Sequence, residues 1–153
     1  MDKVLCLGSH IDDLEIGSGG TLLKHRDAGD EITLAILKSD ENLTGDQWKR
    51  MEEQETSCCI LSARLLTFLS FAEIENIVMK LDEIKPTILY MPWPVDTHQD
   101  HSFAAKVGLA VSRNVYGTVL QYLTPTSHSY YPNYLSVIDW KAKKKLISVF
   151  KSQ

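Results

Sequence analysis

Histidine and carboxylate residues gather in two short segments of this chain. One segment reads Ser-His-Ile-Asp-Asp-Leu-Glu over residues 9–15, and the other reads Asp-Thr-His-Gln-Asp-His over residues 96–101. Imidazole and carboxylate groups at short spacing are ligands that zinc prefers, and a catalytic zinc site uses three of them and leaves one position for water. The candidate ligands are His10, Asp12 or Asp13, and His98 or His101.

Helix capping is the simpler explanation for the acids, because Asp is a common helix N-cap. A cap needs one carboxylate per helix, however, and it needs no histidines. Asp12 and Asp13 can divide the work, one binding a metal while the other faces the open position. We therefore favour a metal site over capping. His25 and His128 stand apart from both segments, and we expect them to be packed or surface residues.

Strand-like and helix-like patterns alternate along the chain. The expected strands are Val4–Leu7, Glu31–Leu37, Leu65–Leu69, Thr87–Met91 and Val119–Leu123, with a sixth at Tyr134–Ile138. The expected helices cover Thr21–Asp27, Asp46–Leu61, Phe71–Leu81 and Ser102–Arg113, followed by a last helix with Trp140, Ile147 and Phe150. This alternation predicts a Rossmann-like, doubly wound α/β fold, with a mainly parallel sheet and helices on both faces.

Both polar segments directly follow a strand, the first and the fourth. In a sheet of order 3-2-1-4-5 these strands are neighbours at the point where the strand order reverses, which is where such sheets bind ligands. We therefore expect the two segments to meet. The glycines at 17, 19 and 20 do not have dinucleotide-binding spacing, and the acids before them would repel a pyrophosphate. We interpret them as a turn that lets the backbone pass the site before the first helix.

The composition fits one globular domain with no nucleic-acid or membrane partner. Hydrophobic residues make up 44% of the 153 residues and charged residues 24%, which is typical of a soluble protein. A net charge of −4 gives no basic footprint, and the lysines at 141 and 143–145 are expected to form a solvated helix face. The N-terminus reads as a strand rather than a signal peptide, and no apolar run approaches the roughly 20 residues that span a bilayer.

The three cysteines suggest neither a disulfide framework nor a metal knuckle. Cys6, Cys58 and Cys59 are odd in number, and two of them are adjacent. We expect all three to be small core residues in a protein of the reducing cytoplasm.

The motifs then become recognisable. Residues 10–21 resemble the HPDDE-x-x-G-x-GG motif of the LmbE-like (PIG-L) zinc-dependent N-deacetylases, and residues 98–101 resemble the HxDH motif of that family. Residues 50–53 are similar to its R-x-x-E helix start. Tyr131-Pro132-Asn133 and residues 144–153 are similar to its later PN and K…SQ elements. The resemblance covers almost the whole chain in the correct order.

This resemblance implies an enzyme that removes acetate from an N-acetylated amino sugar or its conjugate. It implies that zinc is bound by His10, Asp13 and His101, although iron(II) or cobalt(II) could occupy the same ligands. The implied general base is Asp12, and the residue that polarises the substrate carbonyl is His98. Asp100 would orient His98, and Arg50 aligns with a position that contacts substrate.

The chain departs from the family pattern in three places. Ile11 replaces the proline of the motif, which should be tolerated because that proline only stiffens the turn. Leu14 replaces an acid and could alter the support of the ligands. The chain also ends at Gln153, whereas family members usually continue. We therefore expect a single deacetylase domain over residues 1–153 that lacks the usual C-terminal part, with its oligomeric state left open.

Three other functions deserve comparison with the deacetylase. A family remnant could bind metal and sugar without catalysis. Two histidines and one carboxylate also form the iron site of oxygenases, but those enzymes are antiparallel jelly rolls. A phosphoacceptor receiver module needs an aspartate at the end of its third strand, where this chain has Leu69-Ser70-Phe71.

Overall fold

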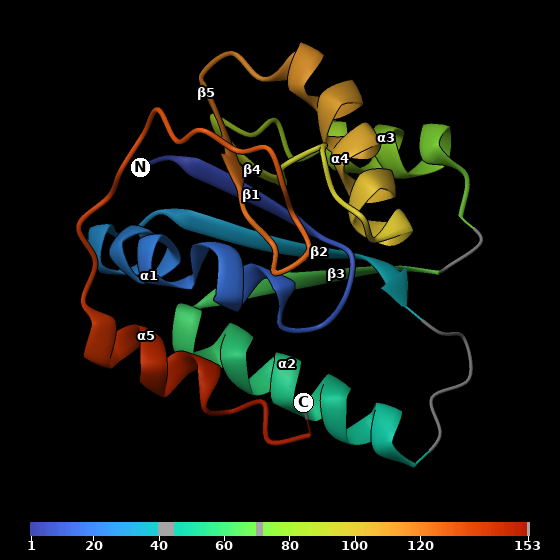
Figure 1. Ribbon diagram of the computed structural model, residues 1–153. Coiled ribbons are helices and arrows are strands. Elements are labelled where there is room, and N and C mark those ends of the chain that lie inside the picture. Colours follow the sequence, from blue (N-terminus) through green and yellow to red (C-terminus); the bar gives the residue numbers. More distant parts are fainter. Residues whose placement is uncertain (40–44, 70–71, 153) are drawn as a thin grey trace.

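The computed structural model describes residues 1–39, 45–69 and 72–152. Its centre is a five-stranded sheet in the order β3-β2-β1-β4-β5, and every neighbouring pair of strands is parallel (Figure 1). The strands are β1 (Lys3–Gly8), β2 (Glu31–Ser39), β3 (Ala63–Leu69), β4 (Ile88–Pro92) and β5 (Thr118–Tyr122). The predicted doubly wound fold and its strand order are confirmed. A parallel sheet excludes the jelly roll of the iron oxygenases.

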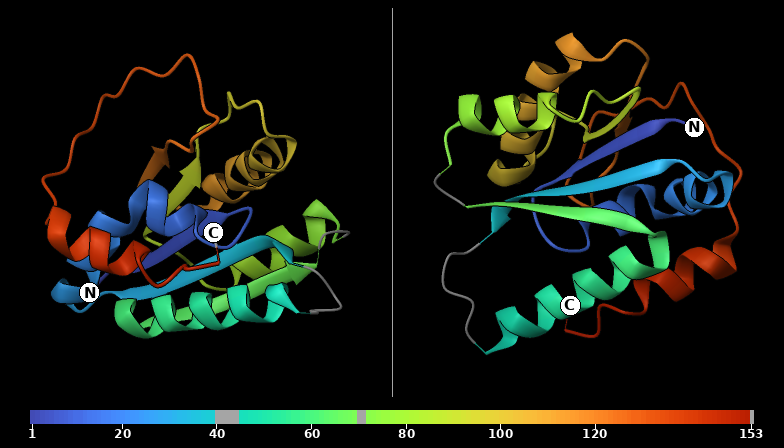
Figure 2. Two further views of the ribbon diagram at one scale, coloured as in Figure 1. Left: turned by 60° about the horizontal axis from the view of Figure 1, so that its bottom comes forward. Right: turned by 180° about the vertical axis from the view of Figure 1, so that it is seen from behind.

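Helices cover both faces of the sheet (Figure 2). They are α1 (Asp13–Ala28), α2 (Asp46–Leu61), α3 (Ile74–Asp82), α4 (Gln99–Val111) and α5 (Trp140–Ile147), with a short 3-10 turn at Ser112–Asn114. Helices α1, α2 and α5 lie on one face, and α3 and α4 lie on the other. None of the helices in the described ranges combines the length and the apolar composition that a membrane span requires.

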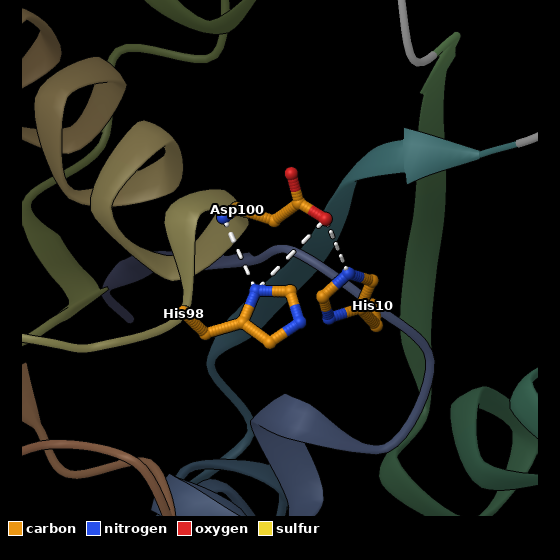
Figure 3. Close-up of side chains that lie close together, drawn as sticks. All are labelled: His10, His98 and Asp100. Atoms are coloured by element: carbon orange, nitrogen blue, oxygen red, sulfur yellow. Dashed lines mark hydrogen bonds and ion pairs between the residues drawn. The ribbon is translucent and has the colours of Figure 1, made fainter.

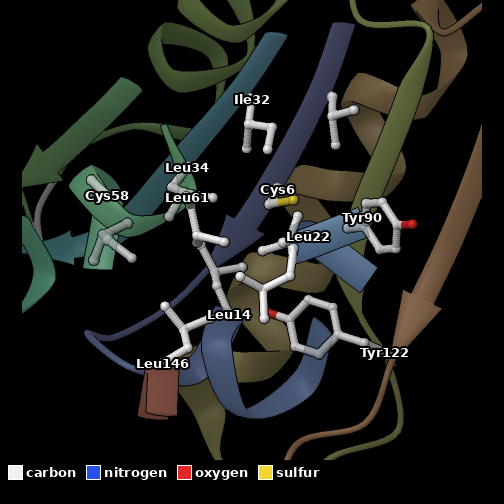
Figure 4. Packing of buried hydrophobic residues seen from close by; sticks show 13 residues of the cluster. Cys6, Leu14, Leu22, Ile32, Leu34, Cys58, Leu61, Tyr90, Tyr122 and Leu146 are labelled. Atoms are coloured by element: carbon white, nitrogen blue, oxygen red, sulfur yellow. The ribbon is translucent and has the colours of Figure 1, made fainter. Parts of the chain in front are cut away.

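The side chains of β1 alternate between two hydrophobic cores, as expected for a strand that is buried on both faces. Val4 and Cys6 belong to the core beneath α1, α2 and α5, which Figure 4 shows. Leu5 and Leu7 belong to the core beneath α3 and α4. The sheet is therefore anchored on both sides, and the ends of its strands form a fixed platform for the loops that follow them.

Helix α1 starts eight residues earlier than the sequence indicates, at Asp13 instead of Thr21. The glycines at 17, 19 and 20 therefore lie inside a helix rather than in a turn, although each costs roughly 1 kcal/mol relative to alanine there. Packing explains them. A Cβ atom on Gly17 would lie 2.2 Å from the ring of Tyr122, and one on Gly20 would lie 2.6 Å from Ile138. The missing side chains let β5 and the C-terminal segment approach α1.

Three further expectations need correction. Tyr134–Ile138 is not a strand; the segment packs its Ile138 against Gly20 instead of joining the sheet. Cys6 and Cys58 are buried, but Cys59 is exposed, because α2 turns that side chain away from the sheet. The third helix begins at Ile74, and the expected start at Phe71 lies outside the described residues.

Candidate metal centre

The two polar segments meet at the carboxyl edge of the sheet, as predicted. The loop after β1 carries His10, and α4, which follows β4, carries His101 in its first turn and has His98 as its N-cap. The imidazole centroid of His10 lies 4.9 Å from that of His98 and 5.5 Å from that of His101. Parallel pairing of β1 with β4 brings residues so distant in the sequence into contact.

One group with metal-binding geometry consists of His10, Asp13 and His101. One ligand atom from each residue lies within 4.8 Å of the others. Nε2 of His101 is 3.3 Å from Oδ1 of Asp13, and Nδ1 of His10 is 3.6 Å from Oδ2 of Asp13. The backbone N–H groups of Ser9 and His10 donate to that same Oδ2, at 3.0 and 2.8 Å. The Asp13 carboxylate is therefore held in place between the two imidazoles.

A second group shares His10 and adds His98 and Asp100 (Figure 3). Nε2 of His10 is 3.0 Å from Oδ2 of Asp100, and that oxygen is 4.0 Å from Nδ1 of His98. This group is the more open one, because His98 is exposed, whereas Asp13 and His101 of the first group are both buried.

His98 is linked to Asp100 through the backbone. The backbone N–H of Asp100 donates to Nδ1 of His98 at 3.2 Å, so that His98 caps α4. The Asp100 carboxylate lies closer to His10, at 3.0 Å, than to Nδ1 of His98, at 4.0 Å. Because Nδ1 of His98 accepts a hydrogen bond, neutral His98 carries its proton on Nε2.

Asp12 lies beside the first group in the left-handed backbone region, with φ of 80°. That region is unfavourable for most side chains but is several-fold enriched in Asp and Asn. Its side chain makes no capping hydrogen bond to α1, so capping does not explain this residue. Burial, together with the charges of Asp13 and Glu15, raises the pKa of Asp12 to about 6, while His10 and Arg50 act in the opposite direction.

Helix α2 supports the backbone of Asp12 through Gln54, a residue that the sequence did not single out. Oε1 of Gln54 accepts from the Asp12 backbone N–H at 3.3 Å, and its Nε2 donates to Glu15 at 2.8 Å. Ser57 also donates to Glu15. Gln54, Ser57 and Glu15 are fully buried. Two polar residues three apart on the buried face of α2 were the available signal, since such a face is otherwise apolar.

Asp96 and Thr126 were also missed as supports of the cluster. Nδ1 of His101 is 3.0 Å from Oγ1 of Thr126 and 3.3 Å from Oδ2 of Asp96. Asp96 lies at the start of the second polar segment, so its carboxylate could have been noticed. Thr126 follows β5 in an ordinary polar loop and offered no signal in the sequence.

The electrostatics of the cluster favour positive charge. The hydrogen bond that Asp13 accepts from His10 raises the pKa of His10. Burial acts to lower the pKa of His101, but its contacts with Asp13 and Asp96 outweigh this effect and raise the pKa. Burial opposes ionisation of Asp13, but its bonds to the two histidines hold the pKa of this carboxyl well below its usual range. A buried carboxylate between two imidazoles is also a common donor set for a divalent transition metal. These residues therefore fit a zinc ion.

The remaining predicted residues lie farther out. Arg50 is exposed on α2, and its charge partly opposes the rise in the pKa of Asp12. His25 bridges Asp30 at 2.8 Å and the hydroxyl of Tyr90 at 3.0 Å, whereas His128 is exposed. Both histidines lie outside the two metal-binding groups, as expected.

A cavity of about 1130 Å³ lies between α1, β5 and residues 123–138. Trp93 and Tyr130 contribute aromatic rings to its wall, and Lys143 contributes an ammonium group. None of the residues of the two metal-binding groups lines it. The cavity is therefore separate from the cluster.

Comparison with known proteins identifies relatives of this chain. The model of the PIG-L family, described as GlcNAc-PI de-N-acetylase, matches residues 5–112. The diacetylchitobiose deacetylase of Thermococcus kodakarensis is 32% identical over an alignment of 127 positions, and the match covers 70% of this chain and 48% of that protein. The chain thus spans about half the length of this curated relative.

Two solved structures show how far the fold is shared. The N,N′-diacetylchitobiose deacetylase of Pyrococcus horikoshii superimposes with a TM-score of 0.74 at 25% identity, over 99% of this chain and 70% of that one. The 4-carboxy-2-hydroxymuconate hydratase GalB of Pseudomonas putida KT2440 superimposes with a TM-score of 0.77 at 15% identity, over 100% and 80%. A deacetylase and a hydratase share this architecture, so the fold alone does not determine the reaction.

Proposed function

The chain belongs to the PIG-L family of de-N-acetylases, and we propose that it is a metal-dependent hydrolase that removes the acetyl group from an N-acetylated amino sugar or its conjugate. The observation that carries this proposal is the convergence of His10, Asp13 and His101 beside Asp12 and His98. A metal site with a free carboxylate and a free imidazole at its edge contains the groups that amide hydrolysis needs.

His10, Asp13 and His101 would hold the metal in preference to the more exposed group around His98 and Asp100. Two of the three preferred ligands are buried, and Asp13 and His101 are each fixed by further hydrogen bonds. A zinc ion in such a site acts as a Lewis acid that polarises a carbonyl group and makes water more acidic.

Asp12 is the proposed general base. Its carboxylate is not used as a cap, and a pKa of about 6 makes it a stronger base than an ordinary aspartate, yet leaves it ionised at neutral pH. It would accept a proton from the attacking water as the water oxygen bonds to the acetamide carbon. When the C–N bond breaks, that proton is returned to the amine, so the products are acetate and a free amine.

His98 is the proposed oxyanion donor. Since its Nδ1 accepts the Asp100 N–H, neutral His98 can donate from Nε2 to the developing oxyanion. Removing one such donor elsewhere costs roughly 3–4 kcal/mol of transition-state stabilisation. In this proposal Asp100 orients His98 through that backbone bond, and Arg50 contacts the more distant part of the substrate.

Zinc content and amine release together test the proposal. Purified protein is analysed for bound metal by elemental analysis and is then incubated with N-acetylglucosamine and with diacetylchitobiose. We expect about one zinc per chain and release of acetate and free amine in equal amounts. Stoichiometric zinc without amine release from either sugar would favour a remnant that binds metal without catalysis, and a longer version of the chain would then be compared.

A further inference from the structure

We propose that Asp96 and Thr126 are positioning residues that fix the imidazole of His101 with its proton on Nδ1 and its Nε2 directed at Asp13. This inference rests on the metal site of the proposed function and adds residues that support one ligand. It concerns Asp96 in the loop after β4 and Thr126 in the loop after β5, and neither residue belongs to a metal-binding group.

The Asp96 carboxylate is completely buried and collects hydrogen bonds. Its Oδ1 accepts from the Thr126 hydroxyl at 2.6 Å and from the His98 backbone N–H at 2.8 Å. Its Oδ2 accepts from Ser127 at 2.9 Å and from Thr124. Both oxygens therefore have partners, and Oδ2 also lies 3.3 Å from Nδ1 of His101.

These contacts determine the direction of each hydrogen bond. An ionised carboxylate only accepts, so the single hydroxyl proton of Thr126 points to Asp96. The oxygen of Thr126 must then accept from Nδ1 of His101, which is 3.0 Å away. A neutral imidazole with its proton on Nδ1 has its lone pair on Nε2, the nitrogen that lies 3.3 Å from Asp13. In the neutral imidazole Nε2 of His101 is therefore free to bind a metal, whereas without a metal the nearby Asp13 carboxylate favours a second proton on this nitrogen.

The loop after β5 is tied firmly enough to hold this arrangement. Asp96 and Ser127 form an isolated antiparallel bridge. The N–H of Thr97 donates to the carbonyl of Thr126 at 3.3 Å, and the N–H of His128 donates to that of Val95 at 3.1 Å. The loop after β4 and the loop after β5 thus pair as a short antiparallel ribbon, and His101 contacts Asp96 and Thr126 within it.

A purely structural role for Asp96 makes a different prediction. If Asp96 only joined the two loops, any lost bond within the ribbon would matter equally. Ser127 offers the matched control, because it donates to the same carboxylate oxygen but makes no contact with His101.

The experiment compares wild type, Asp96→Asn and Ser127→Ala. Zinc affinity is measured by competition with a chromogenic chelator, and the tautomer of His101 is read from imidazole ¹⁵N shifts in metal-free protein at a pH high enough to keep this imidazole neutral. We expect Asp96→Asn to weaken zinc binding by about 10–100-fold, as for other residues that orient ligands. We expect Ser127→Ala to bind zinc nearly as wild type does. The wild-type His101 should be protonated at Nδ1, with a smaller share of that tautomer in Asp96→Asn.

Three outcomes would overturn the inference. The first is a zinc affinity of Asp96→Asn within about threefold of wild type, which is below the usual effect of residues that orient ligands. The second is an equal loss of zinc affinity in Ser127→Ala. The third is a neutral wild-type His101 with its proton on Nε2. If Asp96→Asn does not fold, Thr126→Val should weaken zinc binding and Thr126→Ser should restore it; no difference between these two would also overturn the inference.

Failure of the proposed function is recognised separately. Wild-type protein that binds no metal, or that binds zinc without releasing amine, would contradict the proposed deacetylase activity. The tautomer of His101 in metal-free protein would still decide whether Asp96 and Thr126 orient this imidazole.

Discussion

Glu53 and Ser152 lie 99 residues apart in the sequence and are joined by hydrogen bonds from both the backbone and the side chain of the serine. The Ser152 hydroxyl donates to Oε2 of Glu53 at 2.6 Å, and its N–H donates to Oε1 at 3.1 Å. The N–H of Lys151 donates to the same Oε1 at 3.0 Å. The acid of the R-x-x-E element thus holds the serine of the K…SQ element. This pairing fastens the last described residues to α2.

Glu53→Gln should loosen that attachment. The amide keeps the shape of the carboxylate but loses its charge, and one of its two heavy atoms becomes a donor. We expect a loss of about 1–2 kcal/mol in the free energy of unfolding, measured by urea denaturation. Glu52→Gln, at an exposed position on the same helix, should change stability by less than about 0.5 kcal/mol. Similar losses in both variants would show that the effect comes from charge alone.

Asp12→Asn and His101→Ala should separate catalysis from metal binding. Asparagine tolerates the left-handed backbone at position 12, so the loop should keep its shape. We expect Asp12→Asn to retain about one zinc per chain and lose most amine release, because the base is absent. His101→Ala should lose the metal itself. Equal zinc loss in the two variants, measured by elemental analysis, would contradict the assigned roles.

The ionised Asp12 should lower the stability of the metal-free protein. Its pKa is about 6 in the folded protein, against an ordinary aspartate value of 3.8. A raised pKa means that folding favours the protonated form, so the penalty is fully present above pH 6 and disappears as the pH falls below about 3.8. In the presence of chelator, Asp12→Asn should therefore raise the melting temperature at pH 7.5 and raise it less at pH 4.5. A gain that is independent of pH would contradict this explanation.

Gln54→Leu should lower the free energy of unfolding, although the position lies in a helix. Leucine is an excellent helix former, but it cannot donate to Glu15 or accept from the Asp12 N–H. We expect a loss of about 1–3 kcal/mol in unfolding free energy, because buried polar groups lose a partner. Differential scanning calorimetry would measure the loss. Glu55→Gln, at an exposed position on the same helix, is the control and should be nearly neutral.

Gly17→Ala tests the explanation for the helical glycines. Alanine in an exposed helix would be stabilising by up to roughly 1 kcal/mol. Here the added methyl group would meet the ring of Tyr122, whose hydroxyl donates to the Leu7 carbonyl at 2.7 Å. We expect a loss of about 1–3 kcal/mol from overpacking. Chemical denaturation would give the sign of the change in unfolding free energy, and a more stable variant would refute the packing argument. Thr21→Ala in the same helix controls for helix propensity.

The sequence predicted the sheet and the meeting of the two polar segments because both depend on local patterns. Apolar runs identify buried strands, and the strand order follows from few allowed topologies. His10, Asp13 and His101 could be named because their residue types are unusual after a strand, although the residues alone left Asp12 and His98 as alternatives. The family resemblance narrowed that choice.

What the sequence could not predict depends on contacts between distant residues. Gly17 and Gly20 indicated a turn, since their role in a helix is visible only once Tyr122 and Ile138 are in place. Thr126 and Gln54 are ordinary polar residues whose partners lie 25 and 42 positions away. Local propensity contains no information on such pairs.

The dependence of His101 on Asp96 and Thr126 also has a consequence for biosynthesis. A ribosome delivers residues 10–13 early, but the hydroxyl that orients His101 emerges only after β5 has been made. A growing chain would therefore have all three proposed ligands before it has the group that aims one of them. High metal affinity should then develop only when β5 joins the sheet, and the bound ion would stabilise the folded protein by mass action.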